Sequence, residues 1–374
     1  MDFVIIGGGI YGCTVAWELA QLGAGVMVLE AGEVAGGASG GLGRRGVRAN
    51  GRDLRELPLM RLAYVQWPTL HEAIGGATGY VRTGHLLLIE RQRDLVGAPA
   101  QAWMQNQQGI ETHFLSQSQT RELEPYVSEQ VLGALYCPND GVADHALTTR
   151  SMAKAAQKAG AFLREQTRVT AIEQKGNQVS AVITEAEERI LVKKALVVLA
   201  NAGAAALLQT PFALELPLWA RLPQIILTAV VEPMPVQHLI GHAHRRLAMK
   251  ANPDGRVMIS GGWLGRWNSA TKRGSTELDQ VQSNLADARA VYPCLQEVPI
   301  QQAAADRWET ECADHIPIID RSPQCDNLYF GAGWSGHGWA IAPALGRLVA
   351  EWVFTGKRAP LLQPFAYTRF SQAV

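Results

Sequence analysis

The first thirty residues combine strand and helix patterns around a glycine-rich turn. An apolar run at residues 3–6 has strand character and leads directly into a G-x-G-x-x-G motif at residues 7–12. An amphipathic helix pattern follows, and a second apolar run at residues 26–29 ends at Glu30. A strand, a glycine turn, a helix and a second strand closed by an acid are the fingerprint of a dinucleotide-binding unit. The sequence therefore predicts an α/β fold built on a Rossmann-like domain.

Each residue of this motif has a physical function. Gly7 permits the tight turn, Gly9 lets the backbone approach a pyrophosphate, and Gly12 lets the helix pack closely on the sheet. The unpaired N–H groups at the start of the helix, near Ile10, offer a positive dipole end to phosphates. Glu30 can accept hydrogen bonds from both hydroxyls of a ribose, which favours a nucleotide with a free 2′-hydroxyl.

The composition excludes several classes of protein. The chain has 374 residues, and its 34 basic side chains balance 34 acidic ones, so nothing favours nucleic acid or an anionic membrane as a partner. No apolar run reaches the length of a transmembrane segment. The cysteines are scattered without a C-x-x-C pair, so we expect no metal centre and no disulfide framework. Reduced thiols favour a cytoplasmic location.

The pattern of predicted elements changes along the chain and divides it into two interleaved domains. Short buried strands ending in small residues indicate the nucleotide-binding domain, which we assign to residues 1–79, 141–216 and 301–374. The segments 80–140 and 217–300 are rich in strands and turns of antiparallel type. We expect them to form an antiparallel-sheet substrate domain.

Local patterns predict individual elements within these domains. Residues 80–89 are typical of paired strands turning at Thr83-Gly84. Helical spacing of apolar residues predicts helices near 92–108 and 145–160.

A second glycine-rich loop lies at the other end of the chain. Residues 328–330 form a short strand, residues 331–338 are rich in glycine, and a helix pattern at 341–354 ends at Gly356. A nicotinamide dehydrogenase has no need of a second strand, glycine loop and helix start. A flavoprotein needs this second unit, because the flavin ring requires a helix dipole separate from the one that binds the pyrophosphate.

With both loops in view, the chain resembles the D-amino-acid oxidase and sarcosine oxidase (DAO) superfamily of FAD-dependent oxidoreductases along nearly its whole length. This resemblance implies a Rossmann-like FAD-binding domain of the glutathione-reductase type. Within the superfamily, the chain is most similar to the β-type subunits of hetero-oligomeric sarcosine oxidases and of proline or D-hydroxyproline dehydrogenases. The stretches that carry the resemblance are residues 45–48, 80–86, 137–141, 308–311 and the Gly-Trp-Ser-Gly-His-Gly-Trp loop at 333–339.

The resemblance implies that FAD is the cofactor and places its binding residues. Non-covalent attachment is favoured over a covalent link, because Cys312 does not align cleanly with the cysteine that some relatives use. The residues expected to contact FAD are Gly7, Gly9, Ile10, Gly12, Glu30, Ala31, Ala38, Ser39, Gly40, Arg45, Gly46, Val47, Val169, Ala200, Gly203, Gly333, Trp334, Ser335, Gly336, His337, Gly338 and Trp339.

Two residues are implied to act on the substrate. Arg48 matches the arginine that binds the substrate carboxylate in monomeric sarcosine oxidases, and a bidentate guanidinium suits that task. His337 matches a histidine near the substrate in the same relatives. The chain also departs from the family, because Ala340 stands where those relatives carry a lysine, and no lysine occurs near Gly262-Trp263, where the oxygen-activating lysine is expected. The segment at 308–312 lacks the carboxylate-binding arginine of D-amino-acid and glycine oxidases.

The activity implied is oxidation of the CH–NH bond of a small amino or imino acid, such as a D-amino acid, an N-methyl amino acid or a proline-like substrate. A hydride passes to flavin N5, and the missing lysine favours transfer of electrons to a partner over transfer to oxygen. The expected partners are a larger flavoprotein subunit and a small ferredoxin-like subunit. Alternatives are an oxidase that produces hydrogen peroxide, a weakly catalytic FAD-holding relay subunit, and an oxidoreductase that uses NAD(P)H.

Overall fold

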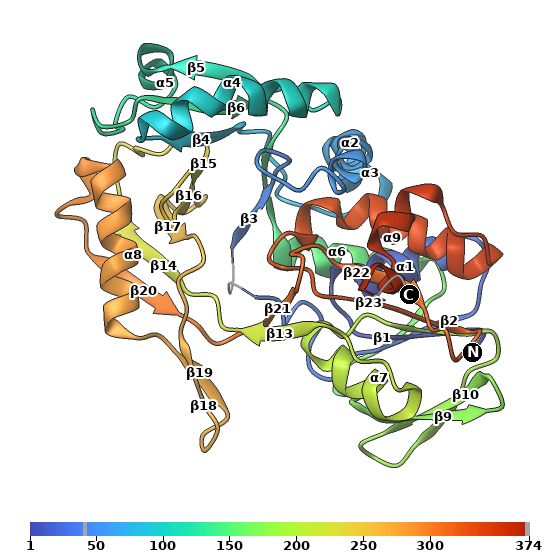
Figure 1. Cartoon of the computed structure of the whole chain (residues 1–374). Coiled ribbons are helices and arrows are strands. Elements are labelled where there is room, and N and C mark those ends of the chain that lie inside the picture. The colour runs from blue at the N-terminus through green and yellow to red at the C-terminus, as the bar shows by residue number, and fades with distance from the viewer. Residues whose placement is uncertain (40–42, 371–374) are drawn as a thin grey trace.

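The computed structural model describes residues 1–39 and 43–370 of the chain, so Gly40 lies outside the described residues. Two large sheets dominate the described part (Figure 1). One is mainly parallel and carries helices; the other is mainly antiparallel and forms the upper left part of the view. The α/β class expected from the sequence is confirmed.

The six-stranded sheet is the parallel one, and its order is β22-β23-β12-β1-β2-β8. Every neighbouring pair is parallel except β22 and β23. Its strands are β1 (Phe3–Ile6), β2 (Val26–Leu29), β8 (Phe162–Arg164), β12 (Ala195–Val198), β22 (Ile318–Arg321) and β23 (Leu328–Ala332).

Both faces of this sheet are buried, which explains why its strands are continuous apolar runs rather than alternating ones. Along β1, Phe3 and Ile5 join one core cluster, whereas Val4 and Ile6 join the other. The first cluster lies under α1 (Ile10–Gln21), α6 (His145–Lys158) and α9 (Gly338–Thr355). The second lies against α7 (Ala204–Phe212) and a three-stranded sheet of β9 (Val169–Lys175), β10 (Gln178–Thr184) and β11 (Arg189–Leu191).

The eight-stranded sheet has the order β20-β14-β17-β16-β15-β4-β6-β5. Its strands are β4 (His85–Ile89), β5 (His113–Ser116), β6 (Gly133–Cys137), β14 (Ile225–Val230), β15 (Leu239–His242), β16 (Ala248–Ala251), β17 (Arg256–Ser260) and β20 (Ile300–Ala304). Helix α8 (Leu278–Val291) packs on one face, and α4 (Gln92–Gln107) and α5 (Gln117–Leu123) lie beside β5 and β6 (Figure 1).

Two sequence-based expectations about this sheet are wrong in detail. The sheet is not wholly antiparallel, because β15 and β4 pair in parallel where its two chain segments meet. Residues 80–89 do not form a hairpin either, because Val81 pairs with Val142 instead. In both cases the partner strand comes from a distant segment, so local patterns carry no information about it.

Two ribbons connect the sheets. Strand β3 (Arg44–Val47) pairs with β7 (Gly141–Asp144), and β13 (Leu218–Arg221) pairs with β21 (Glu309–Cys312), both antiparallel. In Figure 1, β3 runs from the six-stranded sheet toward the eight-stranded one. The remaining elements are α2 (Leu57–Gln66), α3 (Leu70–Ala73), the hairpin of β18 (Arg266–Asn268) and β19 (Arg273–Ser275), and the 3-10 turns η1 (Trp67–Thr69), η2 (Asn201–Gly203), η3 (Pro293–Leu295), η4 (Pro360–Phe365) and η5 (Tyr367–Phe370).

Within residues 1–39 and 43–370, no helix combines the length and the apolar character needed to cross a bilayer.

The packing of α1 against α9 leads to a prediction about stability. A Cβ added at Gly346 in α9 would lie 2.5 Å from Thr14 Cγ2 in α1, whereas a Cβ at Gly97 in α4 meets no atom within 4 Å. Gly346→Ala should lower the free energy of unfolding by about 1–3 kcal/mol through overpacking. The control Gly97→Ala should raise it by about 0.5–1 kcal/mol, because alanine loses less backbone entropy in a helix. Urea denaturation of both variants measures this, and equal effects would contradict the packing described.

Candidate functional site

Two adjoining cavities lie where the six-stranded sheet faces the eight-stranded one. The first, of about 850 Å³, is lined by both glycine loops and is called the nucleotide cavity here. The second, of about 800 Å³, is bounded by residues 45–52 and the C-terminal glycine loop on one side and by the eight-stranded sheet on the other, and is called the sheet cavity. The two share the lining residues Ser39, Arg45, Glu309 and Gly336, so a ligand in one can contact a ligand in the other.

The first glycine loop presents bare backbone to the nucleotide cavity. Gly7 has a φ of +112°, and a Cβ there would lie 2.6 Å from the carbonyl oxygen of Leu199. A Cβ on Gly12 would lie 1.8 Å from the carbonyl oxygen of Gly7, so α1 packs directly on the loop. Gly9, by contrast, has open space where its Cβ would be, and it lines the cavity. This is the arrangement that close approach of a pyrophosphate requires.

Glu30 closes the loop from the end of β2. Its carboxylate accepts hydrogen bonds from the backbone N–H groups of Gly8 at 2.6 Å and Gly32 at 2.8 Å, and it lines the nucleotide cavity. These bonds fix the orientation of the carboxylate relative to the loop and leave further lone pairs for hydroxyl donors.

The C-terminal loop repeats the G-x-G-x-x-G spacing at Gly331, Gly333 and Gly336 and lies against the first loop. The ring of Trp334 stacks on Tyr11 at a centroid distance of 3.7 Å and an interplanar angle of 8°. The Tyr11 hydroxyl donates a hydrogen bond to the carbonyl of Gly338, where α9 begins. The starts of α1 and α9 therefore meet at one cavity.

Basic side chains lie on the same walls, together with the acidic Glu30, Glu33, Asp306 and Glu309. Arg45 and Arg307 both line the nucleotide cavity. Burial, with the neighbouring Arg307 guanidinium as a further cause, lowers the pKa of Arg45 to about 10. Arg307 Nη1 is buried without a hydrogen-bond partner among the described residues. An anionic ligand would satisfy both observations.

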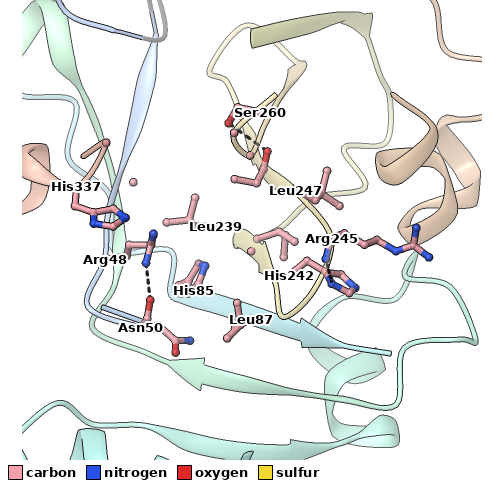
Figure 2. A pocket seen from close by; sticks show the side chains of 18 of the residues that line it. Arg48, Asn50, His85, Leu87, Leu239, His242, Arg245, Leu247, Ser260 and His337 are labelled. Atoms are coloured by element: carbon pink, nitrogen blue, oxygen red, sulfur yellow. Dashed lines mark hydrogen bonds between the residues drawn. The ribbon is translucent and has the colours of Figure 1, made fainter. Parts of the chain in front are cut away.

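Arg48 follows β3 and enters the sheet cavity (Figure 2). Its Nη1 donates to the carbonyl of Asn50 at 2.6 Å. The buried carboxylate of Asp140 accepts hydrogen bonds from the N–H groups of Ala49 at 2.6 Å and Asn50 at 3.2 Å, so it fixes the segment beside Arg48. Burial raises the pKa of Asp140 to about 6.

His337 lines the same end of the sheet cavity as Arg48 (Figure 2). Burial, followed by repulsion from Arg52 and Arg48, holds its pKa well below the ordinary value of histidine. The same causes, burial and then Arg48, lower the pKa of His85 on β4. Both rings are therefore neutral at physiological pH, and the fixed positive charge at this end comes from Arg48 and its neighbours.

The opposite end of the sheet cavity contains His242 and Arg245 (Figure 2). Glu90, His242 and His244 bring their ligand atoms within 4.8 Å of one another, a spacing that could suit a metal ion. Two contacts argue against one. Arg245 Nε donates to Glu90 at 2.7 Å, and His242 Nδ1 accepts the backbone N–H groups of His244 and Arg245. The tautomer of His242 that fits these bonds carries its proton on Nε2, where a metal would need a lone pair.

Most predicted site residues surround one of the two cavities. The nucleotide cavity is lined by Gly7, Gly9, Ile10, Glu30, Ala38, Ser39, Arg45, Ala200, Trp334, Gly336, Gly338 and Trp339. The sheet cavity is lined by Ser39, Arg45, Gly46, Arg48, Ser335, Gly336 and His337. Six predicted residues line neither cavity, and these are Gly12, Ala31, Val47, Val169, Gly203 and Gly333.

Two residues that sequence reasoning did not assign stand out. Glu309 on β21 is 6% exposed, lines both cavities and accepts a hydrogen bond from the Ser39 hydroxyl at 2.5 Å. Burial raises its pKa. Lys250 on β16 is 5% exposed and lines the sheet cavity. The sequence contained no signal for either, because each depends on which face of a strand meets a distant segment.

Comparisons with known proteins agree with this architecture. The chain is 24% identical to the sarcosine oxidase subunit beta of Arthrobacter sp., over 99% of this chain and 91% of that protein. It is 24% identical to the mitochondrial sarcosine dehydrogenase of Mus musculus, over 100% of this chain and 42% of that protein, so it spans less than half the length of this relative. The crystal structure of L-proline dehydrogenase from P. horikoshii superposes with a TM-score of 0.89, at 24% identity, over 99% of this chain and 97% of that one.

The family comparison covers nearly the whole chain. Residues 2–352 match the model of the DAO family, described as FAD dependent oxidoreductase. The match includes the first glycine loop, the segment of Arg48 and the C-terminal glycine loop, which are the parts that build the two cavities. The resemblance drawn from the sequence is confirmed, and the chain belongs to the DAO family of FAD-dependent oxidoreductases.

Proposed function

We propose that this protein is an FAD-dependent dehydrogenase of a small amino or imino acid. The observation that carries the proposal is the position of Arg48. Its guanidinium lies in a cavity that adjoins the nucleotide cavity and faces two neutral histidines. A half-buried arginine that faces a cavity can bind a carboxylate through two parallel N–H groups. The names of relatives that act on sarcosine and proline support this substrate class.

The residues of the nucleotide cavity fit FAD. Gly9 leaves room for a pyrophosphate, Glu30 offers a carboxylate to a ribose, and Arg45 and Arg307 supply positive charge. Cys312 is buried away from both cavities, and burial raises the pKa of its thiol to about 11, which supports non-covalent attachment. When bound, the flavin would accept the hydride equivalent from the substrate Cα–H.

The chain's own side chains would orient the substrate for this step. Arg48 would hold the carboxylate, and Asp140 would hold the segment of Arg48 in place through its bonds to Ala49 and Asn50. The neutral ring of His337 can accept a hydrogen bond from the substrate nitrogen without repelling it. Fixing both ends of the substrate limits its motion to the reactive orientation.

The fate of the electrons is part of the proposal. The relative from Arthrobacter is a subunit by name, which supports a hetero-oligomer. That its other subunits are a larger flavoprotein and a small ferredoxin-like protein stays a prediction from the sequence resemblance. All five cysteines are free thiols, which supports a reducing, cytoplasmic setting. If the purified protein forms hydrogen peroxide rapidly during turnover, it is an oxidase and not a dehydrogenase.

Anaerobic reduction of the flavin tests the function directly. Purified holoprotein is mixed with sarcosine, proline, glycine and D-amino acids, and the flavin absorbance is followed. We expect bleaching by at least one of these compounds. If none of them reduces the flavin while dithionite does, the chain is an FAD-holding relay subunit instead.

The role of Arg48 predicts the effect of removing its charge. Arg48→Met should lower kcat/KM by about ten- to hundredfold, because hydrogen bonds to a charged group contribute about 1.5–3 kcal/mol. Steady-state kinetics measure this with the substrate found above. The exposed Arg82, converted to methionine, serves as the control and should leave kcat/KM unchanged. Equal kinetics of the Arg48 and Arg82 variants would contradict the assignment.

The unpartnered guanidinium of Arg307 predicts an effect on cofactor affinity. Arg307→Met should raise the Kd for FAD by about ten- to hundredfold, since a charged hydrogen bond to the cofactor is lost. Titration of FAD into the apoprotein, followed by flavin fluorescence, measures this Kd. Arg82→Met is again the matched control. An unchanged Kd in the Arg307 variant would show that Arg307 does not contact the pyrophosphate of FAD.

Arg52 couples the two segments that would hold the substrate. It donates hydrogen bonds to the carbonyls of Arg48 and of His337, the latter at 2.7 Å, and pairs with Glu56 at 3.1 Å. The side chains of Arg52 and Glu56 are almost fully buried. Burial raises the pKa of Glu56, so the carboxylate depends on Arg52 for its charge.

This coupling predicts two separable effects. Arg52→Met should lower the free energy of unfolding by about 3–5 kcal/mol, because it leaves the buried charge of Glu56 uncompensated. Adding Glu56→Gln should restore part of that stability, since the second variant removes the orphaned charge. The double variant should still bind substrate weakly, because it lacks the Arg52 side chain that donates hydrogen bonds to the carbonyls of both Arg48 and His337. Recovery of both stability and KM in the double variant would contradict a positioning role.

A further inference from the structure

The sheet cavity contains a buried lysine that the proposed function does not use. Lys250 lines the cavity, and only 5% of the residue is exposed. Among the described residues its ammonium has neither a hydrogen bond nor an ion pair. A buried lysine without a partner is rare, because the charged form loses its hydration without compensation.

The register of the sheet shows where Lys250 points. In the antiparallel pair of β16 and β17, Lys250 lies opposite Met258 and Ala248 lies opposite Ser260. Directly opposed residues share one face of a sheet, and all four line the cavity. Met258 in turn contacts Arg45 Nη1 through its sulfur at 3.8 Å. The side chain of Lys250 therefore projects from the sheet toward the segment of β3 and Arg48.

The groups that face Lys250 are mostly cations or neutral side chains. From the segment of β3 come Arg45 and Arg48, which act on it electrostatically, and Arg44, which binds the carbonyl of Ala251. Burial, then Arg45 and Arg48, lowers the pKa of Lys250 to about 7. The lining residues of β15 and β17 on this face, Leu239, Gly241, Met258 and Ser260, do not ionise. The other titratable groups that line the cavity are Arg52, His85, Arg93, Asp94, Arg221, His242, Arg245, Glu309 and His337.

Arg48 and Lys250 line the same cavity, and the carboxylate of the substrate in the proposed function would supply an anion for both. We propose that Lys250 and Arg48 bind the substrate carboxylate together, and that Lys250 takes up a proton as the carboxylate enters. This step rests on the proposed function for its substrate. A carboxylate beside Lys250 stabilises the ammonium form, so anion binding and proton uptake are linked.

The proton has a source within the substrate itself. An amino acid arrives as a zwitterion, whose nitrogen must lose one proton before its lone pair can assist loss of the Cα hydrogen. Transfer of that proton to neutral Lys250 leaves a neutral amine and a lysine ammonium paired with the carboxylate. No proton enters or leaves the cavity in this exchange. When a plain carboxylate without an amine binds, Lys250 must instead take its proton from water.

Binding of acetate to the oxidised holoprotein tests the proposal without catalysis. Perturbation of the flavin absorbance gives the Kd between about pH 6 and pH 9. We expect a nearly constant Kd below the pKa of free Lys250, about 7, and a rise of about tenfold per pH unit above it, because binding then requires a proton. Lys250→Arg should bind acetate with little dependence on pH, since arginine stays charged. Lys250→Met should bind about ten- to hundredfold more weakly, also with little dependence on pH.

Controls separate this proposal from misfolding and from failure of the proposed function. The exposed Lys154, converted to methionine, should behave like the wild type, and the arginine variant at 250 should retain its FAD. If wild type and Lys250→Met share one Kd and one pH dependence, the proposal is overturned. If acetate binds as expected but no amino acid reduces the flavin, the result supports the anion site and contradicts the proposed oxidation.

Discussion

The contact between the two glycine loops is the constraint on which the rest of the structure depends. The Tyr11 hydroxyl and the carbonyl of Gly338, which form the hydrogen bond, are 327 positions apart in the chain. They meet because the loops follow β1 and β23, which flank β12 in one parallel sheet and end at the same edge. The nucleotide cavity thus exists only when this strand order has formed, and Arg52 extends the same link to the segment of Arg48.

The contact between the two glycine loops also explains why positive groups meet in the nucleotide cavity. Helices α1 and α9 both begin at the wall of the nucleotide cavity, so two positive dipole ends reach one space. Arg45 and Arg307 add to that potential. Such crowding costs free energy in a buried space, and an anionic ligand removes the cost. The helix starts and the two arginines therefore favour an anionic group beside them, although Glu30, Glu33, Asp306 and Glu309 line other parts of the cavity.

The sequence was informative where structure is local. The first glycine loop was predicted correctly, as were the helices expected near 92–108 and 145–160, which the structure places at Gln92–Gln107 and His145–Lys158. Glycine spacing and helical periodicity depend only on near neighbours. Pairing between distant strands does not, so Val81 with Val142 and the parallel contact of β15 with β4 could not be read from the chain. For the same reason Lys250 and Glu309 gave no signal, whereas Arg48 is assigned through the family resemblance of its motif.

The separate origins of the cations in the sheet cavity have a mechanical consequence. Arg48 comes from the ribbon beside the six-stranded sheet, and Lys250 comes from the eight-stranded sheet. Ala340, which stands where relatives carry a lysine, has no charged side chain and is fully buried in the core cluster. A carboxylate bound by Arg48 and Lys250 would bridge the two sheets. Substrate affinity would then depend on how the β3–β7 and β13–β21 ribbons hold those sheets together, and residues far from the cavity would influence it through that spacing alone.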